Sequence, residues 1–505
     1  MKHSILLFSI NHWLLVILLI LVSCTNDQVD RKPNFVFLFA DDLSYNALGY
    51  LGNSVVQTPN IDRIAQTGIS FTNTYNMGGW NAAICVASRS MIISGLSVWD
   101  AHEASINWPT NDSVIINQTW PKLLEQNGYQ TFMTGKWHVK LPVESVFQRV
   151  GIERPGMPGD RRMETPFQEI EEAYQMGEDI NHLFPIGYAR PIDENDQSWS
   201  PSDSIHGGFW EGGKHWSEVV RDDAFAFIEE AQDNAKPFFM YLSFNAPHDP
   251  RQAPQEYVDL YPLEDIDLPT NFLEEYPFKD DIGNDILLRD ESLAPFPRTP
   301  HAVKTHIQEY YAIISHLDTQ IGLILDKLEQ SGSLDNTYIF FTADHGLSVG
   351  SHGFLGKQNM YDHSVRVPFI MAGPGIQGGQ IATQDIYLQD IMPTTLEIAN
   401  IDIPNDVFFH SIMDIVNQQN TEGHYADGIY GAYKDLQRMI QKDHYKLIVY
   451  PNIQKTLLFD LKNDPYEMED LSDLDEYQPK LDSLMNDLKS LQIQLNDTID
   501  LQADN

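Results

Sequence analysis

The sequence predicts an α/β fold with a mostly parallel central sheet sandwiched by helices, followed by a smaller C-terminal antiparallel sheet and a helix. Continuous apolar runs of strand length are the first observation behind this prediction, because strands buried on both faces of a parallel sheet lack polar positions. The second observation is that long amphipathic stretches separate these runs, as expected when helices cover both faces of the sheet. The third observation is a change in the sequence pattern towards the C-terminal end, where short candidate strands are separated only by turn residues.

Residues 1–24 are expected to be an export signal rather than part of the fold. Lys2 supplies a positive charge, and Trp13–Val22 is an unbroken apolar run of ten residues, shorter than the roughly 20 apolar residues of a spanning helix. The segment ends in Leu21-Val22-Ser23-Cys24, which resembles a bacterial lipobox, so Cys24 is predicted to be lipidated. An ordinary secretory signal with an incidental cysteine is the alternative. The sequence thus predicts an exported bacterial lipoprotein of the periplasm, outer membrane or cell surface, which contacts the membrane only through its lipid anchor.

Residues 33–415 are predicted to form the large α/β domain. Asn34–Ala40 (NFVFLFA) is apolar throughout except for its first residue, and similar runs occur at Gln130–Thr134, Pro237–Phe244 and Tyr338–Thr342. An amphipathic helix is predicted over Val303–Leu328, because its apolar residues recur near helical spacing. Residues 141–214 and 250–302 lack clear periodicity and are expected to be insertions, long excursions from the sheet of the kind that carries specificity.

Residues 420–500 are predicted to form the small C-terminal subdomain. Candidate strands lie at Gly428–Tyr433, His444–Tyr450 and Thr456–Asp460, close enough together for an antiparallel sheet. A helix is predicted to begin near Pro479, since proline suits the first turn of a helix. Its predicted apolar face consists of Leu481, Leu484, Leu488, Leu491 and Leu495.

Composition limits the classes of partner. The chain has 505 residues, of which 42% are hydrophobic and 11% aromatic, enough for a sizeable core. A formal net charge of -40 argues against nucleic acid or an anionic lipid surface as a partner, because the overall field repels polyanions. Cys24 and Cys85 are the two cysteines, which excludes a disulfide framework and any metal site built from several thiolates.

Each predicted core strand ends in polar residues that could take part in chemistry. These are Asp41-Asp42, Gly135-Lys136-Trp137-His138, Asn245-Ala246-Pro247-His248 and Asp344-His345-Gly346. In open α/β sheets, ligands bind outside the carboxyl ends of the strands, so these groups are expected to meet at one edge. An isolated Asp pair is more often a turn or helix cap, and an isolated His is more often structural. Together they favour a hard-cation site beside acid–base groups. Aspartates suit calcium or magnesium whereas a histidine suits them less well, so these residues leave the metal open.

Cys85 is the one cysteine after the export signal, and it precedes a predicted helical stretch at Arg89–Ile93. A helix N-terminus stabilises an anion through its backbone N–H groups and dipole. Arg89 lies four residues after Cys85, on the same helix face, and could pair with that anion. On this pattern alone, a buried small residue followed by an unrelated arginine is the favoured interpretation.

The segment Cys85-Val86-Ala87-Ser88-Arg89 resembles the signature of the sulfatase family, Cys-x-Pro-Ser-Arg or Cys-x-Ala-Ser-Arg, in which the cysteine is oxidised to formylglycine. Other motifs resemble the same family in the same order along residues 33–471. They are FLFADDLSYNALGYLGN, TPNIDRIAQTG, TGKWHVK, NAPHDP, FTADHGLSVGSHGFLGKQNMYDHSVRVPFI and LLFDLKNDPYEMEDLS. The resemblance implies an alkaline-phosphatase-like fold, in agreement with the strand pattern, and hydrolysis of sulfuric esters.

The resemblance also implies a role for individual residues. One calcium ion would be bound by Asp41, Asp42, Asp344, His345 and the oxidised side chain of Cys85 (3-oxoalanine). The hydrate of that side chain would attack sulfur and would be held by Arg89, while Lys136 and Lys357 bind sulfate oxygens. His248, helped by Lys357, would protonate the leaving alcohol, and His138 would take the proton that releases sulfate. A cation cluster at this position stabilises charge that develops in the transition state.

Two residues depart from the commonest family pattern. Ala87 stands where many members have proline, which bears on which formylglycine-generating maturation enzyme accepts the chain. His345 stands where asparagine is the commoner ligand, although histidine also occurs there. His352, before Lys357, could contact substrate or pack against its own loop.

The resemblance and the lipobox favour a bacterial polysaccharide sulfatase acting on an algal glycan such as ulvan, carrageenan or fucoidan, ahead of host glycosaminoglycans. The net charge implies local recognition by basic residues, namely Arg89, Lys136, Lys140, Arg161, Arg162, Lys214 and Lys357. Phe209, Trp210 and Trp216 could stack on sugar rings or simply anchor their loop. Two alternatives stay open: a phosphomonoester or phosphonate hydrolase on the same scaffold, and a non-catalytic lipoprotein that binds glycan.

Overall fold

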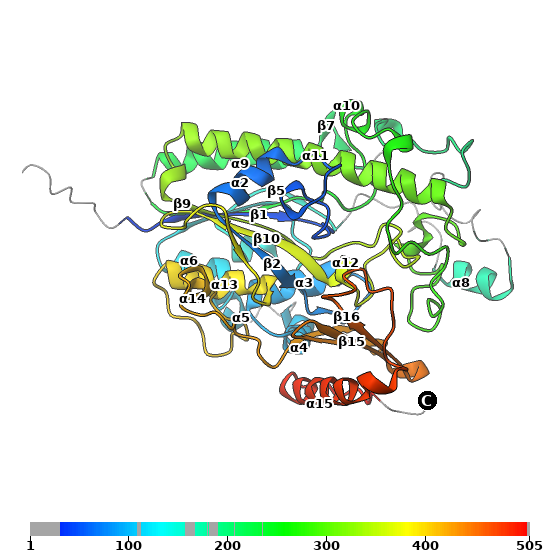
Figure 1. Ribbon diagram of the computed structural model, residues 1–505. Helices are drawn as coiled ribbons and strands as arrows, with labels where there is room; N and C mark the ends of the chain where they lie inside the picture. Colours follow the sequence, from blue (N-terminus) through cyan, green and yellow to red (C-terminus); the bar gives the residue numbers. More distant parts are fainter. Residues whose placement is uncertain are drawn as a thin grey trace, which may run out of the picture.

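The structure is a computed structural model that describes residues 31–108, 113–156, 167–178, 180, 190–206, 208–234 and 236–501. Nine strands among these residues form one large sheet, in the order β11-β2-β10-β9-β1-β8-β4-β5, with β12 paired beside β2 (Figure 1). The strands are β1 (Asn34–Ala40), β2 (Ile69–Tyr75), β4 (Gln130–Lys136), β5 (Arg149–Arg154), β8 (Phe238–Ser243), β9 (Thr337–Ala343), β10 (Arg366–Ala372), β11 (Gln380–Ala382) and β12 (Ile386–Tyr387).

The centre of this sheet is parallel, as predicted. β1 pairs in parallel with β8 on one side and β9 on the other, so that Phe35 lies opposite both Phe239 and Tyr338. All residues of 35–40 are buried, because helices cover both faces of the strand. The four apolar runs predicted from the sequence are β1, β4, β8 and β9, and they are neighbours in the sheet. β10 runs antiparallel to β9 and β2.

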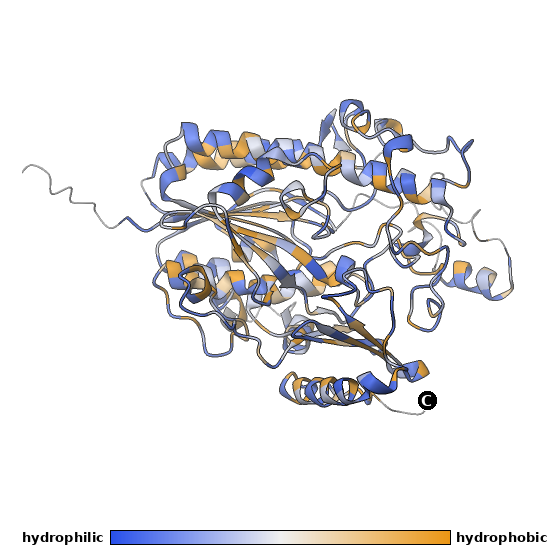
Figure 2. Ribbon diagram, in the orientation of Figure 1, coloured by the Kyte–Doolittle hydropathy of each residue, from blue (hydrophilic) through white to orange (hydrophobic). Residues whose placement is uncertain are grey.

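Helices form a layer on each face of the sheet (Figure 1). One layer contains α2 (Pro59–Thr67), α9 (Trp216–Gln232) and α11 (Pro300–Gln330), and the other contains α3 (Ile84–Ser94), α6 (Trp120–Gln126) and α13 (Ile391–Ile398). The helix predicted at 303–328 is α11, which extends a little further at both ends. Thr299 caps it by accepting a hydrogen bond from the Ala302 backbone N–H at 3.1 Å, and Pro300 occupies its first turn. Figure 2 shows hydrophobic residues concentrated on the strands and on helix faces turned towards them.

The small sheet near the C-terminus has five strands within the described residues, in the order β16-β15-β14-β13-β3. They are β3 (Gly78–Gly79), β13 (Ile429–Tyr433), β14 (Gln437–Lys442), β15 (Tyr445–Tyr450) and β16 (Lys455–Asp460). The three predicted strands are β13, β15 and β16, whereas β14 was not predicted. β3 joins β13 in parallel and brings the chain before Cys85 onto this sheet. Gly78 is required there, because its φ is 83° and a Cβ would collide with the carbonyl oxygen of Ala432.

The predicted C-terminal helix is α15 (Gln478–Gln494), which packs on β14 and β15. Leu484, Leu488, Leu491 and Leu495 are buried as expected, while Leu481 is half-buried. The helix and the small sheet share a second core with residues of α3 and α4 (Val98–Asn107), such as Met91 and Val98. The small sheet is therefore packed against the large domain rather than separated from it.

The predicted insertions contain more regular structure than their sequences suggest. β5, within 141–214, pairs in parallel with β4 and forms an edge of the large sheet. Short elements make up much of the rest, both here and elsewhere in the chain. They are α5 (Ser113–Asn117), α7 (Val143–Val146), α8 (Phe167–Gln175), β6 (Trp210–Glu211), β7 (Lys214–His215), α10 (Gln255–Val258), α12 (Asp362–Val365) and α14 (Met413–Val416). The predicted export signal, with Cys24, lies outside the described residues. Within the described part, no helix combines the length and apolarity needed to cross a membrane.

Candidate active site

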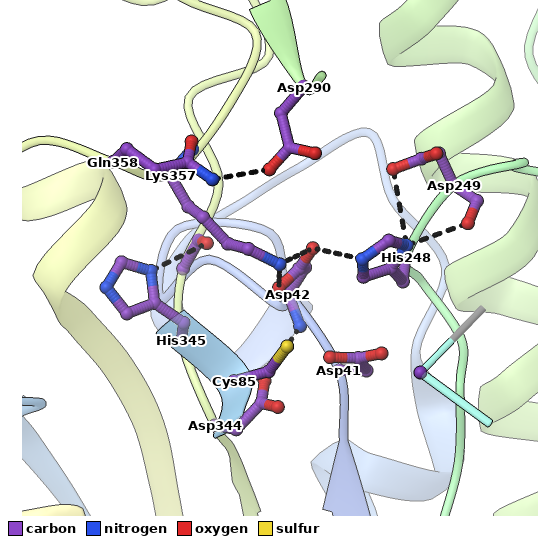
Figure 3. Close-up of polar contacts among 12 residues, drawn as sticks. Asp41, Asp42, Cys85, His248, Asp249, Asp290, Asp344, His345, Lys357 and Gln358 are labelled. Carbon is purple, nitrogen blue, oxygen red and sulfur yellow. Dashed lines mark hydrogen bonds and ion pairs between the residues drawn. The ribbon is translucent and has the colours of Figure 1, made fainter. Parts of the chain in front are cut away.

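The carboxyl ends of β9, β1, β8 and β4 lie side by side and bring the polar residues predicted from the sequence to one edge of the sheet (Figure 3). Asp41 and Asp42 follow β1, and Asp344 follows β9. Asp42 has a φ of 64° and His138, after β4, a φ of 55°, so the chain turns sharply at both places. Such left-handed conformations of residues other than glycine are concentrated at functional sites.

Asp41 and Asp344 are two fully buried carboxylates of the site. The Asp344 side chain accepts hydrogen bonds from the Asp42 backbone N–H at 3.1 Å and from Arg89 Nε at 2.8 Å. Burial would raise the pKa of Asp344, but Arg89, Lys136 and nearby positive charge outweigh it and hold that pKa below its usual range. The pKa of Asp41 is raised well above its usual value by burial and by the Asp344 charge, even though Lys136 Nζ contacts its Oδ2.

Arg89 ties three strands together from helix α3. Its Nη1 donates to the Lys136 carbonyl oxygen at 2.9 Å and to Ser243 Oγ at 2.6 Å, while Nε bonds Asp344. The guanidinium lies over the Phe39 ring, 4.6 Å from its centroid, and the side chain is fully buried. A planar guanidinium can serve several acceptors at fixed angles in a way that lysine cannot. Arg89 thus fixes the relative positions of the ends of β4, β8 and β9.

Cys85 lies in the first turn of α3, which begins at Ile84 rather than after the cysteine as predicted. Its Sγ is 3.3 Å from His138 Nδ1. Burial raises the pKa of the thiol, but Lys136, His138 and Lys357 outweigh burial and bring that pKa well below its usual value. These positive charges and the helix N-terminus would stabilise an anion at this position.

Lys357 and His248 approach Asp42 from opposite sides (Figure 3). Lys357 Nζ is 2.6 Å from Asp42 Oδ2, and His248 Nε2 is 3.5 Å from the same oxygen. His248 Nδ1 is 2.7 Å from the Asp249 carbonyl oxygen, which orients the ring. Burial and the charge of Lys357 lower the pKa of His248 well below its usual value. Burial raises the pKa of Asp42 to about 7 despite the opposing effect of Lys357.

The predicted calcium ligands are only partly gathered. Ligand atoms of Asp41, Cys85 and Asp344 all lie within 4.8 Å of one another. Asp42 is not in this group, because its carboxylate is held by Lys357. His345 is not in it either: Nδ1 is 3.2 Å from the Gly346 carbonyl oxygen, and the ring lies beside the Lys357 side chain (Figure 3).

The residues nevertheless fit a hard cation. Asp41 Oδ1 is buried without a hydrogen-bond partner among the described residues, and an ion held by Asp41 and Asp344 would satisfy it. Burial lowers the pKa of His345 to about 3, so the ring is neutral and can donate a lone pair. Sulfur is a poor ligand for calcium, whereas an oxygen on an oxidised Cys85 would complete an oxygen-rich set.

Several residues around the site were not foreseen from the sequence. Ser243 accepts from Arg89, and Gln358 Nε2 donates to Asp290 Oδ2 at 2.7 Å. Arg289 pairs with Asp249, next to His248. Arg289 and Asp290 come from the aperiodic segment 250–302, and no motif in the sequence marks them. Ser243 could have been predicted, because it is a polar residue at the end of the apolar strand β8.

His352 packs against its own loop rather than facing the site. Its Nδ1 is 3.1 Å from His363 Nε2, its Nε2 is 3.0 Å from the Glu467 carbonyl oxygen, and its ring stacks on Tyr361. All its ring nitrogens therefore have partners within the protein.

The aromatic residues considered as a sugar platform anchor their loop. Phe209 is fully buried against Trp216, and the Arg154 guanidinium covers the Trp216 ring at 4.5 Å from its centroid. Trp210 meets His215 edge to face. Among the basic residues proposed for local recognition, Lys140 is exposed. Lys214 Nζ is 2.6 Å from Asp222, and Arg161 and Arg162 lie outside the described residues.

Comparison with known proteins finds sulfatases that match nearly the whole chain. The chain is 29% identical to an arylsulfatase of Clostridium perfringens, covering 90% of this chain and 93% of the relative. It is 27% identical to an N-acetylglucosamine-6-O-sulfatase of Bacteroides thetaiotaomicron, over 94% and 89% of the two chains. It is 25% identical to an ulvan-active sulfatase of Formosa agariphila, over 94% and 84%.

Solved structures support the fold. A structure described as a complex with its substrate D-glucosamine-2-N,6-O-disulfate has a TM-score of 0.67, with 24% identity over 94% of this chain and 100% of that one. A phosphonate monoester hydrolase from Silicibacter pomeroyi has a TM-score of 0.68, with 18% identity over 92% and 96%. At these identities, the likeness establishes the alkaline-phosphatase-like fold alone.

Family models account for most of the chain. The model for the C-terminal part of N-sulphoglucosamine sulphohydrolase matches residues 350–494. The sulfatase model matches residues 33–401, a range that includes Cys85 and every residue of the edge described above. The chain therefore belongs to the sulfatase family and is a sulfuric ester hydrolase.

Proposed function

We propose that this sulfatase removes sulfate from a sulfated carbohydrate, namely an algal polysaccharide such as ulvan or its oligosaccharides, using a formylglycine made from Cys85 and a bound calcium ion. The observation that carries the proposal is the position of Cys85 at the N-terminus of α3, 3.3 Å from His138 and surrounded by the buried cations Arg89, Lys136 and Lys357. Two of the relatives above act on sulfated sugars by name, which supports a carbohydrate substrate.

In this proposal each residue of the edge has a separate task. Arg89 orients the oxidised side chain of residue 85, and Lys136 and Lys357 bind the non-bridging sulfate oxygens. His248, helped by Lys357, donates a proton to the departing sugar oxygen, on which negative charge develops. His138 accepts a proton at Nδ1 from residue 85, so that the site is restored.

Two groups complete this chemistry. A hydrated formylglycine supplies one hydroxyl to attack sulfur and a second whose deprotonation releases sulfate. Asp41, Asp42, Asp344, His345 and the oxidised residue 85 would hold the calcium ion, which stabilises negative charge on the sulfate oxygens. A formylglycine-generating enzyme that accepts Ala87 in the motif is part of the proposal.

The lipid anchor at Cys24 and an exported location, in the periplasm or at the outer surface, also belong to the proposal. Both rest on the amino-terminal sequence.

The test is sulfate release from a panel of defined substrates by protein co-produced with a maturation enzyme. The panel contains p-nitrophenyl sulfate, p-nitrophenyl phosphate, and sulfated oligosaccharides of ulvan, carrageenan, fucoidan and heparin. We expect hydrolysis of the aryl sulfate and of at least one sulfated oligosaccharide. Absence of sulfate release from every sugar in the panel would contradict a carbohydrate substrate.

A phosphomonoester or phosphonate hydrolase is the second candidate, because three buried cations at one site could also hold a dianionic group. The ratio of kcat/KM values on the aryl sulfate and the aryl phosphate separates the two. A ratio in favour of phosphate would replace the proposed function. A non-catalytic glycan-binding protein would release neither ion and would retain an unmodified Cys85 in peptide mass spectra.

A further inference from the structure

A hollow lies next to the chain segment that precedes Cys85. It has a volume of about 480 Å³ and is lined by residues of four separate segments. Trp80 belongs to the loop between β3 and α3, His102 to α4, Lys434 to the turn between β13 and β14, and 496–499 to the chain after α15. We call this hollow the Trp80 pocket.

Backbone contacts join the Trp80 pocket to the catalytic edge. Trp80 precedes Cys85 by five residues, so the two Cα atoms are at most about 18 Å apart. The Lys434 backbone N–H donates to the Gly79 carbonyl oxygen at 2.9 Å, which fixes the turn against the Trp80 loop. Gln358, next to Lys357, donates from Nε2 to the Ala82 carbonyl oxygen at 2.9 Å.

The wall of the pocket combines an aromatic face with positive charge. Trp80 is half-buried and its indole stacks on the His102 ring at 5.1 Å between centroids, which fixes the orientation of the indole. Lys434 is half-exposed, with Nζ 5.3 Å from the Tyr433 ring centroid, and no ion pair among the described residues neutralises it. Asp435 is an exposed carboxylate on the same turn.

The remaining charges of the wall compensate each other. Arg438 stacks on Trp99, with its guanidinium 5.0 Å from the ring centroid. It also forms a two-pronged ion pair with Asp497, at 2.7 and 2.9 Å. Lys434 therefore remains as the cation of this wall without an ion-pair partner among the described residues, against Asp435, in a protein whose formal net charge is -40. Local positive charge beside an aromatic face suits an anionic sugar.

We propose that the Trp80 pocket binds a further ring of the sulfated oligosaccharide whose reactive ring occupies the catalytic edge, with Trp80 against the sugar face and Lys434 opposite an anionic substituent. This inference rests on the proposed function, and it makes the enzyme selective for oligosaccharides over single sulfated sugars. The substituent is a sulfate or a uronate carboxylate, which share the charge that Lys434 would recognise.

The test compares two substrates: the sulfated tetrasaccharide of the panel that the wild type desulfates fastest, and the sulfated monosaccharide that corresponds to its reactive end. The measured quantity is the ratio of their kcat/KM values. We expect the wild type to prefer the tetrasaccharide and Trp80→Ala to lower the ratio about tenfold. A tenfold loss corresponds to about 1.4 kcal/mol, within the range of contacts between aromatic rings. Trp80→Phe should restore part of the wild-type ratio.

Lys434→Gln should lower the ratio about threefold. This effect should disappear with a substrate whose second ring carries neither sulfate nor carboxylate. Substrates whose second ring carries only a sulfate or only a carboxylate then identify the anion that Lys434 binds.

Trp210→Ala and Lys462→Gln are the matched controls, since they remove a half-exposed tryptophan and an exposed lysine elsewhere. Both should keep the wild-type ratio. The proposal is overturned if Trp80→Ala and Lys434→Gln both keep the ratio of kcat/KM values within about twofold of the wild type. It is also overturned if Trp210→Ala lowers this ratio as much as Trp80→Ala does. Lys434→Gln leaves the core intact and decides the matter if Trp80→Ala fails to fold. Sulfate release by the wild type from at least one sulfated oligosaccharide separates these outcomes from a failure of the proposed function, in which no sugar in the panel is desulfated and the pocket proposal falls with it.

Discussion

Lys136 ends β4 and His248 lies in the loop after the neighbouring strand β8, and the two side chains contact different carboxylates. His248 Nε2 is 3.5 Å from Asp42 Oδ2, and Lys136 Nζ contacts Asp41 Oδ2 beside Cys85. In the proposed function, His248 would protonate the departing alcohol, and Lys136 would bind sulfate oxygens that are present with any leaving group. The two roles can be separated because only the first depends on how basic the leaving oxygen is.

We predict that His248→Ala loses most of its kcat/KM on a sulfated sugar and much less on p-nitrophenyl sulfate. General acid catalysis is typically worth ~10²–10⁴-fold, and a sugar alcohol needs it far more than a nitrophenol does. Lys136→Ala should depress both substrates by similar factors and serves as the comparison. An equal loss on both substrates in His248→Ala would make His248 a binding residue and transfer the acid role to Lys357.

The site residues that could be predicted from the sequence are those that directly follow buried strands. Asp41, Asp42 and Asp344 are examples: continuous apolar runs locate the strand ends, and parallel pairing then brings them together. Their partners could not be predicted, because pairing depends on side-chain direction. Lys357 reaches Asp42 from a segment 315 residues away in sequence, and this contact withdraws Asp42 from the Asp41–Cys85–Asp344 group.

At the scale of elements, α2 depends on a carboxylate from another helix. Thr58, at its N-cap, makes no side-chain capping bond. Asp318 of α11 accepts instead from the backbone N–H groups of Asn60 at 3.0 Å and Ile61 at 2.7 Å. One side chain thus satisfies two donors that a helix N-terminus leaves open and joins two helices of the same layer.

We predict that Asp318→Ala lowers the free energy of unfolding by on the order of 2 kcal/mol, because it leaves these donors without an acceptor. The control is Asp326→Ala on the same helix, which removes an exposed ion pair with Arg63 and should cost less than about 1 kcal/mol. Denaturant unfolding measures both variants. A loss in Asp318→Ala no greater than in Asp326→Ala would contradict the interhelix cap.

The strands that sequence analysis missed have identifiable reasons. β10 contains Pro368, and its pairing with β2 shifts register between Val367 and Phe369, so the strand lacks a regular pattern. β14 reads Gln437–Lys442, with polar residues inside a buried strand. Gln437 is buried because its side chain donates to the Gln358 carbonyl oxygen at 2.9 Å, a tertiary contact that local sequence does not reveal.

At the scale of the whole molecule, a buried cation fastens the small sheet to the large domain. Lys446 of β15 contacts Asp362, at the start of α12, and bonds Glu467 at 2.7 Å. Glu467 also accepts from the Asp362 backbone N–H at 2.8 Å. Burial raises the pKa of Glu467 to about 7, although Lys446 opposes this.

We predict that Lys446→Ala lowers the free energy of unfolding by about 3–5 kcal/mol, because it removes the cation from two buried carboxylates. Lys455→Ala on the neighbouring strand removes the half-exposed pair with Asp470 and should cost less than about 1 kcal/mol. Thermal unfolding of both variants checks this. A midpoint for Lys446→Ala equal to that of Lys455→Ala would show that the small sheet does not depend on this contact.

In the proposed function, the residues around Cys85 all serve a nucleophile made from its side chain. The most direct measurement is kcat/KM for sulfate release by Cys85→Ala, with Ser90→Ala as the control. Ser90 is buried on the same helix, and its hydroxyl has no hydrogen-bond partner among the described residues. We predict a loss of at least ~10³-fold in Cys85→Ala with an unchanged unfolding midpoint, and activity within about threefold of the wild type in Ser90→Ala. Activity of Cys85→Ala within about tenfold of the wild type would contradict it.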